Sequence, residues 1–368
     1  MRVYCNDCGK NATFTIAEWR CSCGGAWEIA ELPAFDPKKI VGKDYSIWRY
    51  GDLMGLDIRS PIKHMGVGWT PLVQVPLMGK KTYLKLEFLS PSGSFKDRGV
   101  NAMVNQLAFM GTQAVAEDSS GNAGASLAAH AARFGIQAKI FVPHYASAGK
   151  KFQIGIYGAE VNAIPGIRSD AEKAAQASIS EVCAYASHGY NPAYLVGQVT
   201  AAYEIWEQMG RKAPDWIILP VAQGGLLLGC WLGFSQLLKA GLIEKLPALV
   251  AVQSAQIAPI FEAWKQGWDH IPAAESKGQT IAEGVAISKP VRDKRLLQAL
   301  RETNGNVLAI EENAITQAQQ MIAQLGYFIE PTSALAIAGF QQLDKDIRDD
   351  ETVVLPLTGS GLKGLPQY

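Results

Sequence analysis

Short apolar runs alternate with longer amphipathic stretches through most of the chain. Runs typical of strands occupy residues 82–88, 114–116, 138–142 and 160–164. Helical patterns occupy residues 100–110, a small-residue stretch ending at 134, a stretch after 150, and residues 170–185. Because strand and helix patterns follow one another in this way, they predict a parallel sheet covered by helices on both faces.

A second series of the same kind begins near Trp216. Strand patterns cover residues 216–221, 248–253, 307–310 and 352–357, and helical patterns cover a stretch from 226 and residues 259–266, 314–325 and 333–343. Cys183 and Cys230 fall within helical patterns, where we expect them to be buried. The two series predict an α/β fold class with two open, twisted parallel-sheet domains and a cleft between them.

The N-terminal part lacks this alternation. Four of the six cysteines lie within the first 23 residues, as two close pairs that are each followed by glycine. Such pairs predict two knuckles that bind a structural zinc ion through Cys5, Cys8, Cys21 and Cys23. The alternative is a set of reduced thiols on a small β-hairpin unit, because disulfides are rare in the cytosol.

These patterns predict the domain boundaries. A Cys-rich, zinc-ribbon-like unit covers residues 1–30, and a large cofactor-binding domain covers residues 31–95 and 195–368. A smaller, mobile domain covers residues 96–194. Within the large domain, residues 32–63 are irregular apart from a short helical pattern at 48–54.

Composition and charge narrow the class of partner. Lys and Arg total 34, as do Asp and Glu, so no basic field favours nucleic acid or an anionic membrane. No apolar run reaches the roughly 18 residues that a membrane span needs, and the first residues do not resemble a signal peptide. We therefore expect a cytoplasmic enzyme that acts on a small molecule.

Lys96 is the first candidate for chemistry. The strand pattern at 82–88 is followed by a Pro/Gly/Ser turn, and a helix pattern begins around Lys96 with Asp97 in its first turn. The positive end of the helix dipole disfavours the ammonium form of a lysine placed there. Lys96 is therefore a candidate Schiff-base former, although a solvated lysine in a first turn would give the same pattern.

Three other turns follow predicted strands, where ligands of open α/β sheets bind. In the turn Asp118-Ser-Ser-Gly-Asn-Ala-Gly124, backbone N–H groups can bind a carboxylate, and Asn122 offers a donor and an acceptor. The turn Pro220-Val-Ala-Gln-Gly-Gly-Leu226 can expose N–H groups to a phosphate. The turn Leu355-Pro-Leu-Thr-Gly-Ser360 places hydroxyls between glycines, which can offer a heterocyclic nitrogen a neutral hydrogen bond. Each turn alone is also typical of ordinary structure, and neither a dinucleotide fingerprint nor a P-loop is present.

Together these motifs, with Phe328-Ile-Glu-Pro-Thr-Ser-Ala334, resemble the pyridoxal-phosphate enzymes of the tryptophan-synthase-β fold over residues 48–363. Within that family they are most similar to the threonine synthases, because Gly-Ser-Phe-Lys96-Asp-Arg-Gly differs from the usual sequence of the related dehydratases. Many threonine synthases also begin with a Cys-rich unit. The resemblance implies pyridoxal 5'-phosphate in the cleft and a homodimer.

The resemblance also implies roles for individual residues. Lys96 would hold the cofactor and shuttle protons, Asn122 would hydrogen-bond the pyridine 3-hydroxyl, and Thr358 would face the pyridine nitrogen. The cofactor phosphate would be bound by Ala222, Gln223, Gly224, Gly225 and Leu226. The α-carboxylate of a small amino-acid substrate would be bound by Ser119, Ser120, Gly121, Asn122 and Ala123. Glu330 matches a family position, where we expect it to cap a helix that begins at Pro331.

One segment departs from the family pattern. In Asn191-Pro-Ala-Tyr-Leu-Val-Gly-Gln-Val-Thr200, Tyr194 stands where threonine synthases have a substrate-binding arginine, and Val199 stands where they have a lysine. A phosphate dianion prefers charge-assisted donors, and a phenol supplies one neutral donor. Tyr194 thus belongs to the predicted substrate site but weakens the case for a phosphorylated substrate. The candidate replacements are Lys150, Lys151 and Arg168.

The resemblance implies conversion of O-phosphohomoserine and water to threonine and phosphate. The alternative is β-elimination or β-replacement on another small amino acid, as in a threonine or serine dehydratase or a cysteate synthase. The segment Thr280-Ile-Ala-Glu-Gly-Val-Ala286 is similar to the dehydratase branch. Two further classes are a non-catalytic binding protein that kept the fold and a zinc-mediated interaction module at the N-terminus.

Overall fold

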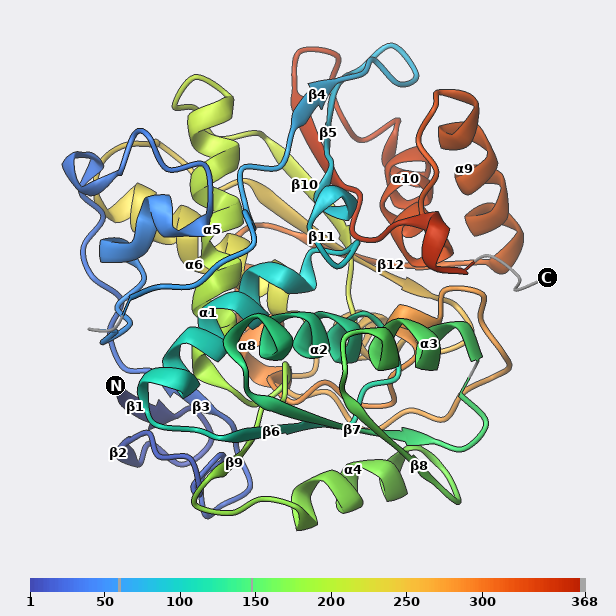
Figure 1. Ribbon diagram of the computed structural model, residues 1–368. Coiled ribbons are helices and arrows are strands. Elements are labelled where there is room, and N and C mark those ends of the chain that lie inside the picture. The colour runs from blue at the N-terminus through green and yellow to red at the C-terminus, as the bar shows by residue number, and fades with distance from the viewer. Residues whose placement is uncertain (59–60, 147, 365–368) are drawn as a thin grey trace. The chain divides into compact units, whose positions relative to one another are not determined.

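The computed structural model describes residues 1–58, 61–146 and 148–364 (Figure 1). Its contacts divide the chain into two units. Unit 1 contains Met1–Gly68, Ser90–Gln198 and the end of the described chain from Lys363. Unit 2 contains Trp69–Leu89 and Val199–Leu362.

Unit 1 begins with a small antiparallel sheet of order β2-β1-β3, formed by β1 (Arg2–Cys5), β2 (Asn11–Thr13) and β3 (Trp27–Ile29). Two 3-10 helices follow, η1 (Pro37–Lys39) and η2 (Ile47–Leu53). The indole N–H of Trp48 donates to Oδ1 of Asn101 at 2.7 Å, and η2 packs in one apolar cluster with Ala102 and Val196. These contacts place residues 31–68 in unit 1, whereas the sequence pattern assigns them to the large domain.

The main sheet of unit 1 is fully parallel, with the order β8-β7-β6-β9. Its strands are β6 (Ala114–Glu117), β7 (Gln137–Pro143), β8 (Glu160–Ile164) and β9 (Cys183–Tyr185). Its helices are α1 (Lys96–Phe109), α2 (Asn122–Phe134), α3 (Ala148–Ile156) and α4 (Arg168–Ala177). Figure 1 shows α2 and α3 on one face of this sheet and α4 on the other.

Unit 2 contains a sheet of order β12-β11-β10-β13-β5-β4, which is parallel except for the antiparallel pair β4 and β5. Its strands are β4 (Leu72–Gln74), β5 (Lys81–Lys85), β10 (Trp216–Pro220), β11 (Ala248–Ser254), β12 (Asn306–Ile310) and β13 (Thr352–Pro356). Its helices are α6 (Gly225–Lys239), α7 (Pro259–Lys265), α8 (Asp293–Glu302), α9 (Glu312–Gln324) and α10 (Pro331–Leu343), with short 3-10 helices η3 (Glu87–Leu89), η4 (Glu283–Val285) and η5 (Gly361–Gly364). The central strands β10, β11 and β13 are mostly apolar because both faces of a parallel sheet are covered.

The α/β prediction is confirmed, with exceptions that have physical causes. The helix predicted at 170–185 is wrong in its second half: α4 ends at Ala177, and the Ser180 hydroxyl accepts from the Cys183 N–H at 3.2 Å, so that Cys183 begins a strand. Cys183 and Cys230 are both buried, as expected. Helix α5 (Pro192–Gln208) was not predicted, because it is buried on nearly every side and lacks an amphipathic pattern. Among the described residues, no helix is both long and apolar enough to cross a membrane.

Candidate functional site

Lys96 is the first residue of α1, directly after the turn that follows η3. The turn is closed by the Gly93 N–H, which donates to the Ser90 carbonyl at 2.7 Å. The lysine side chain is half-buried, and its Nζ lies 4.8 Å from the Phe95 ring centre and 5.9 Å from the Tyr194 ring centre. Two aromatic rings therefore confine the amine that the sequence marks as reactive.

Asp97 fixes the helix turn that carries Lys96. Its fully buried carboxylate accepts from the Ser92 N–H at 2.7 Å, the Ser92 hydroxyl at 2.6 Å and the Ser126 hydroxyl at 2.5 Å. His130 Nδ1 lies 3.9 Å from the same carboxylate. These contacts attach the start of α1 to the turn before it and to α2, so Asp97 is structural support for the lysine.

The turn between β6 and α2 contains the predicted carboxylate-binding residues. A Cβ atom at Gly124 would lie 1.9 Å from the Ser119 carbonyl oxygen. Only glycine therefore fits at this position, where the start of the helix packs against the turn before it. Helix α2 begins at Asn122 without a side-chain cap, and residues 118–122 are half-buried. Uncapped N–H groups at a helix start are suited to an anion such as a carboxylate.

Tyr194 lies in the first turn of α5 and is 1% exposed. Its ring packs on α1, where a Cβ atom at Gly99 would lie 2.4 Å from Cδ2 of the tyrosine. Burial raises the pKa of Tyr194 well above its usual value, and the charge of Glu117 adds to the shift, so the hydroxyl stays neutral. The Tyr194 hydroxyl and Oε1 of Gln198 are both buried and have no hydrogen-bond partner among the described residues.

The positions that should bind a substrate phosphate therefore carry no cation in this chain. Val199 is also buried, and the half-buried Lys151 donates to the His144 carbonyl at 3.2 Å. Arg168 begins α4, and the side chain of Lys150 lies outside the described part of the chain.

A buried acid–imidazole pair was not anticipated from the sequence. Glu117 is the last residue of β6, and its carboxylate contacts both the His188 N–H at 3.3 Å and His188 Nδ1 at 3.1 Å. Burial raises the pKa of Glu117 well above its usual value, the Asp118 charge adds to the shift, and Lys96 opposes it. The available signal was an acidic dipeptide, Glu117-Asp118, directly after an apolar strand and before a Ser-Ser-Gly-Asn turn.

In unit 2, the turn between β10 and α6 contains the predicted phosphate-binding residues. Gly224 has φ 77°, and a Cβ atom there would lie 2.2 Å from Cδ2 of Leu296. Helix α6 begins at Gly225 without a side-chain cap, while Oε1 of Gln223 accepts from the Val291 N–H at 2.9 Å. The turn thus offers backbone N–H groups at a helix start, which suits a phosphate.

Thr358 lies at the same edge of this sheet, because β13 is the parallel neighbour of β10. Its buried hydroxyl lies 2.9 Å from the Ser333 hydroxyl, which accepts from the Gly359 N–H at 2.7 Å. Glu330 takes the N-cap position of α10, as predicted, and its carbonyl accepts from the Ser333 N–H at 2.9 Å. Its carboxylate makes no capping hydrogen bond. A Cβ atom at Gly359 would lie 2.2 Å from that carboxylate.

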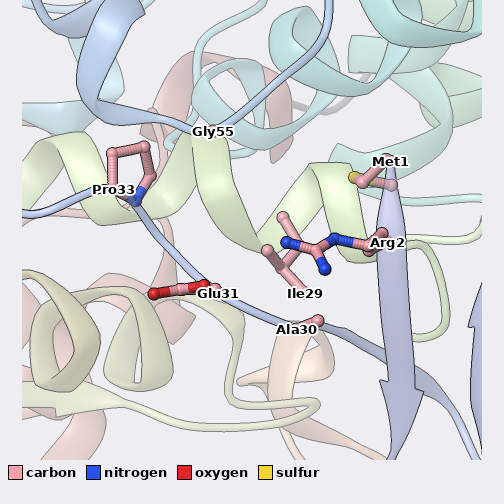
Figure 2. A pocket seen from close by; sticks show the side chains of 7 residues that line it. All are labelled: Met1, Arg2, Ile29, Ala30, Glu31, Pro33 and Gly55. Atoms are coloured by element: carbon pink, nitrogen blue, oxygen red, sulfur yellow. The ribbon is translucent and has the colours of Figure 1, made fainter.

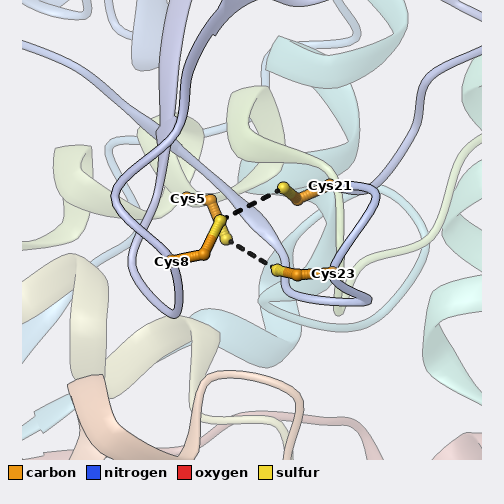
Figure 3. A group of neighbouring side chains, drawn as sticks. All are labelled: Cys5, Cys8, Cys21 and Cys23. Atoms are coloured by element: carbon orange, nitrogen blue, oxygen red, sulfur yellow. Dashed lines mark hydrogen bonds between the residues drawn. The ribbon is translucent and has the colours of Figure 1, made fainter.

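The four N-terminal cysteines converge (Figure 3). Their sulfur atoms all lie within 4.8 Å of one another, with 3.5 Å between Cys5 and Cys23 and 3.6 Å between Cys8 and Cys21. Gly9 and Gly24 have φ 74° and 95°, which shape the two knuckle turns. Burial raises the pKa of Cys5 to about 12, whereas the Cys23 N–H lowers the pKa of Cys21 to about 7.

A pocket in unit 1 is lined by other residues (Figure 2). The lining consists of Met1, Arg2, Ile29, Ala30, Glu31, Pro33 and Gly55. None of these residues is assigned to the cofactor, the substrate or the metal, so the pocket adds nothing to the candidate site.

Comparison with known proteins gives a consistent result. The family model described as "Pyridoxal-phosphate dependent enzyme" matches residues 63–359. The chain is 34% identical to the threonine synthase of Methanocaldococcus jannaschii over 98% of this chain and 92% of the relative. A threonine deaminase structure from T.th. aligns with a TM-score of 0.69 at 26% identity, over 81% of this chain and 93% of that chain. The serine racemase of Dictyostelium discoideum aligns with a TM-score of 0.68 at 26% identity, over 79% and 92%.

Proposed function

The chain belongs to the pyridoxal-phosphate dependent enzymes, and from this membership we propose that it is a lyase that converts O-phosphohomoserine and water to threonine and phosphate. The observation that carries the proposal is the 34% identity to a threonine synthase over 98% of the chain. The structural neighbours named threonine deaminase and serine racemase act on other amino acids and support only the shared cofactor chemistry.

The donor sets of the two units fit the cofactor. Pyridoxal phosphate bears four groups that a protein must bind. Its aldehyde requires an amine, its phosphate requires N–H donors, its phenolic oxygen can be bound by an amide, and its ring nitrogen can be bound by a neutral hydrogen-bond partner. Unit 1 offers Lys96 and Asn122, and unit 2 offers the uncapped start of α6 and the Thr358 hydroxyl. Gly224 lets this turn take a positive φ of 77° against the Leu296 side chain, where a Cβ atom would collide.

When bound, the cofactor supplies an electron sink for the carbon that loses a proton. In our proposal Lys96 holds it covalently and moves the proton at the substrate's α carbon, between the two rings that confine the amine. Asn122 donates to or accepts from the phenolic oxygen, and the N–H groups of residues 222–226 bind the phosphate. When Ser333 donates to Thr358, the Thr358 hydrogen is available to an unprotonated ring nitrogen.

The substrate's α-carboxylate is assigned to residues 119–123, whose N–H groups surround the start of α2. Tyr194 remains the residue assigned to the distal part of the substrate. Since it is a buried neutral phenol, it can bind an oxygen by one hydrogen bond but cannot neutralise a phosphate.

That same observation favours a second candidate, the elimination or replacement of an uncharged β substituent. Tyr194 and Val199 are both buried and uncharged where phosphate binding would require cations. A hydroxy amino acid such as threonine or serine would need no such cations.

One comparison tests both candidates. The purified protein is loaded with cofactor and given phosphohomoserine, phosphoserine with sulfite, threonine and serine in parallel. Phosphate release with threonine formed supports the first candidate, and keto-acid or cysteate formation with inert phosphohomoserine supports the second. Borohydride should abolish the visible absorbance and fix the cofactor on Lys96, and Lys96→Ala is the control. A protein that takes up no pyridoxal phosphate would contradict both.

We also propose that the four cysteines bind one structural zinc ion. With Zn–S bonds of about 2.3 Å, a tetrahedral site requires sulfur separations of about 3.8 Å. Two of the separations here are 3.5 and 3.6 Å, and all lie within 4.8 Å. Metal analysis should find one zinc per chain, lost in Cys8→Ser and retained in Cys183→Ala. Chelation should lower the unfolding temperature of the protein without changing the cofactor absorbance.

The family's usual assembly and the balanced charge lead us to propose a cytoplasmic homodimer. Sedimentation analysis of the cofactor-loaded protein at micromolar concentration tests the dimer directly, and a monomer at that concentration would contradict it.

A further inference from the structure

Glu117 and His188 meet at the carboxyl edge of the unit 1 sheet. Glu117 ends β6 and His188 follows β9, the neighbouring parallel strand, and Ala116 pairs with Tyr185 between them. Both carboxylate oxygens of Glu117 contact His188. One accepts from the His188 N–H at 3.3 Å, and the other lies 3.1 Å from His188 Nδ1. The side chains are only 2% and 11% exposed. The pair holds one transferable proton as acid and imidazole or as carboxylate and imidazolium, and it can accept that proton when it consists of carboxylate and neutral imidazole.

Tyr194 lies next to this pair and to the reactive lysine. Its ring centre is 6.0 Å from the His188 ring in an edge-on arrangement, and 5.9 Å from Nζ of Lys96. Its hydroxyl is buried and has no hydrogen-bond partner among the described residues, and the same is true of Oε1 of Gln198 one turn further along α5. Buried polar atoms in native proteins are almost always paired, so these two mark a place for a ligand oxygen or a water molecule.

We propose that the Glu117–His188 pair carries the proton of the oxygen that bonds to the substrate's β carbon, and that the Tyr194 hydroxyl holds that oxygen. This inference rests on the proposed function. In threonine formation, an O–H bond of water breaks as the oxygen bonds to the β carbon, the electron pair of the α,β double bond moves to the α carbon, and the proton goes to the pair in its deprotonated state. In the elimination of a hydroxyl group, the electron pair on the α carbon forms the α,β double bond, the carbon–oxygen bond breaks with its electron pair leaving on the oxygen, and the pair in its protonated state gives that oxygen the proton.

Addition and loss of water are therefore the same step in opposite directions, and one proton carrier serves both candidate reactions. His188 and Tyr194 are the groups that face the oxygen, and Glu117 is a positioning residue that acts through His188. The groups that surround Glu117 come from every neighbouring segment: His188 after β9, Asp118 after β6, Lys96 of α1, Arg168 of α4 and Tyr194 of α5. Burial and the Asp118 charge raise the pKa of Glu117, so its carboxyl binds a proton more readily than an exposed glutamate and can share one with His188.

The test compares Glu117→Gln with the parent holoenzyme. Glutamine keeps the shape and one acceptor oxygen but cannot carry the proton. Exchange of the α hydrogen of bound amino acid with deuterated solvent reports on Lys96 alone, and we expect it to stay within about threefold of the parent. Turnover should fall by about 10²-fold or more, mainly in kcat, with a flattened pH profile. Glu181→Gln, the same change at an exposed turn residue, should alter neither. Unchanged turnover and pH profile in folded Glu117→Gln would overturn the proposal.

A second readout is independent of turnover. Proton NMR of the holoenzyme should show exchange-protected, downfield imidazole N–H resonances from two histidines: His130, whose buried Nδ1 lies 2.9 Å from the Ser126 carbonyl, and His188. The His130 resonance should persist in every variant. The resonance that is lost in His188→Gln should also disappear in Glu117→Gln and persist in Glu181→Gln. If the parent converts none of the tested substrates, the proposed function fails while this resonance still tests the pair. Absence of the resonance from the parent overturns the pair.

Discussion

Replacing Tyr194 by phenylalanine should stabilise the protein while it impairs the enzyme. The Tyr194 hydroxyl is buried without a partner among the described residues, and a buried unsatisfied polar group costs about 1–3 kcal/mol. Phenylalanine keeps the ring against Gly99 and removes that cost. We therefore expect Tyr194→Phe to raise the free energy of unfolding by about 1–2 kcal/mol and to lower turnover, because the hydroxyl no longer holds the reacting oxygen.

Tyr203 provides a matched control on the same helix, α5. It is also fully buried, but its hydroxyl donates to Oε1 of Gln236. Tyr203→Phe removes this buried hydrogen bond and should lower the free energy of unfolding by about 1–3 kcal/mol. Urea unfolding of the cofactor-free proteins, followed by circular dichroism, measures both changes. If Tyr194→Phe destabilises as much as Tyr203→Phe, the Tyr194 hydroxyl has a permanent partner and the reasoning about an open oxygen site is wrong.

Three further predictions concern charge and backbone. Lys85→Met removes the cation from a buried ion pair, because Lys85 lies 2.9 Å from Glu204 and both side chains are at most 1% exposed; it should lower the free energy of unfolding by about 3–5 kcal/mol in urea, and the double change Lys85→Met, Glu204→Leu by much less. The pKa of Glu117 is raised in the folded state, so protonation of Glu117 favours the folded protein. This contribution to the free energy of unfolding is complete below the unfolded pKa of about 4.3. It is lost as pH rises through the folded pKa. Glu117→Gln should therefore gain stability relative to the parent as pH rises, and a pH-independent difference would contradict the shift. Gly224→Ala should weaken cofactor binding in equilibrium dialysis because a Cβ atom would lie 2.2 Å from a leucine side chain, whereas Gly241→Ala, also at positive φ but with open space, should not.

The sequence predicts the elements of this fold best where both local pattern and flanking turns agree. Strands β7, β8 and β11 lie within a residue or two of their predicted ranges, because apolar runs end at clear Gly, Pro or polar boundaries. Helix α5 lacks the amphipathic signal because nearly all of its residues are buried. Helix α4 ends at Ala177, and the turn that follows is stabilised by the Ser180 hydroxyl. Hydrophobic periodicity carries no information about such a side-chain hydrogen bond.

For the candidate site, motifs locate single turns but not the contacts between them. The sequence places Lys96 at a helix start and Thr358 after a late strand, and the structure has both there. It does not reveal Ser333 as the partner of Thr358, because 25 residues separate them. Nor does it reveal Glu117 with His188, which only the parallel pairing of β6 and β9 brings together.

The departure at position 194 is part of a larger local change. A tyrosine there needs glycine at 99, since any Cβ atom would meet its ring at 2.4 Å, and it lies beside a histidine paired with a buried glutamate. An arginine would place a permanent charge in this environment, whereas the glutamate and histidine present can gain or lose a proton. The chemistry that these residues favour near Lys96 is therefore the gain or loss of a proton on an oxygen, and binding of a phosphate dianion would have to come from elsewhere in the chain.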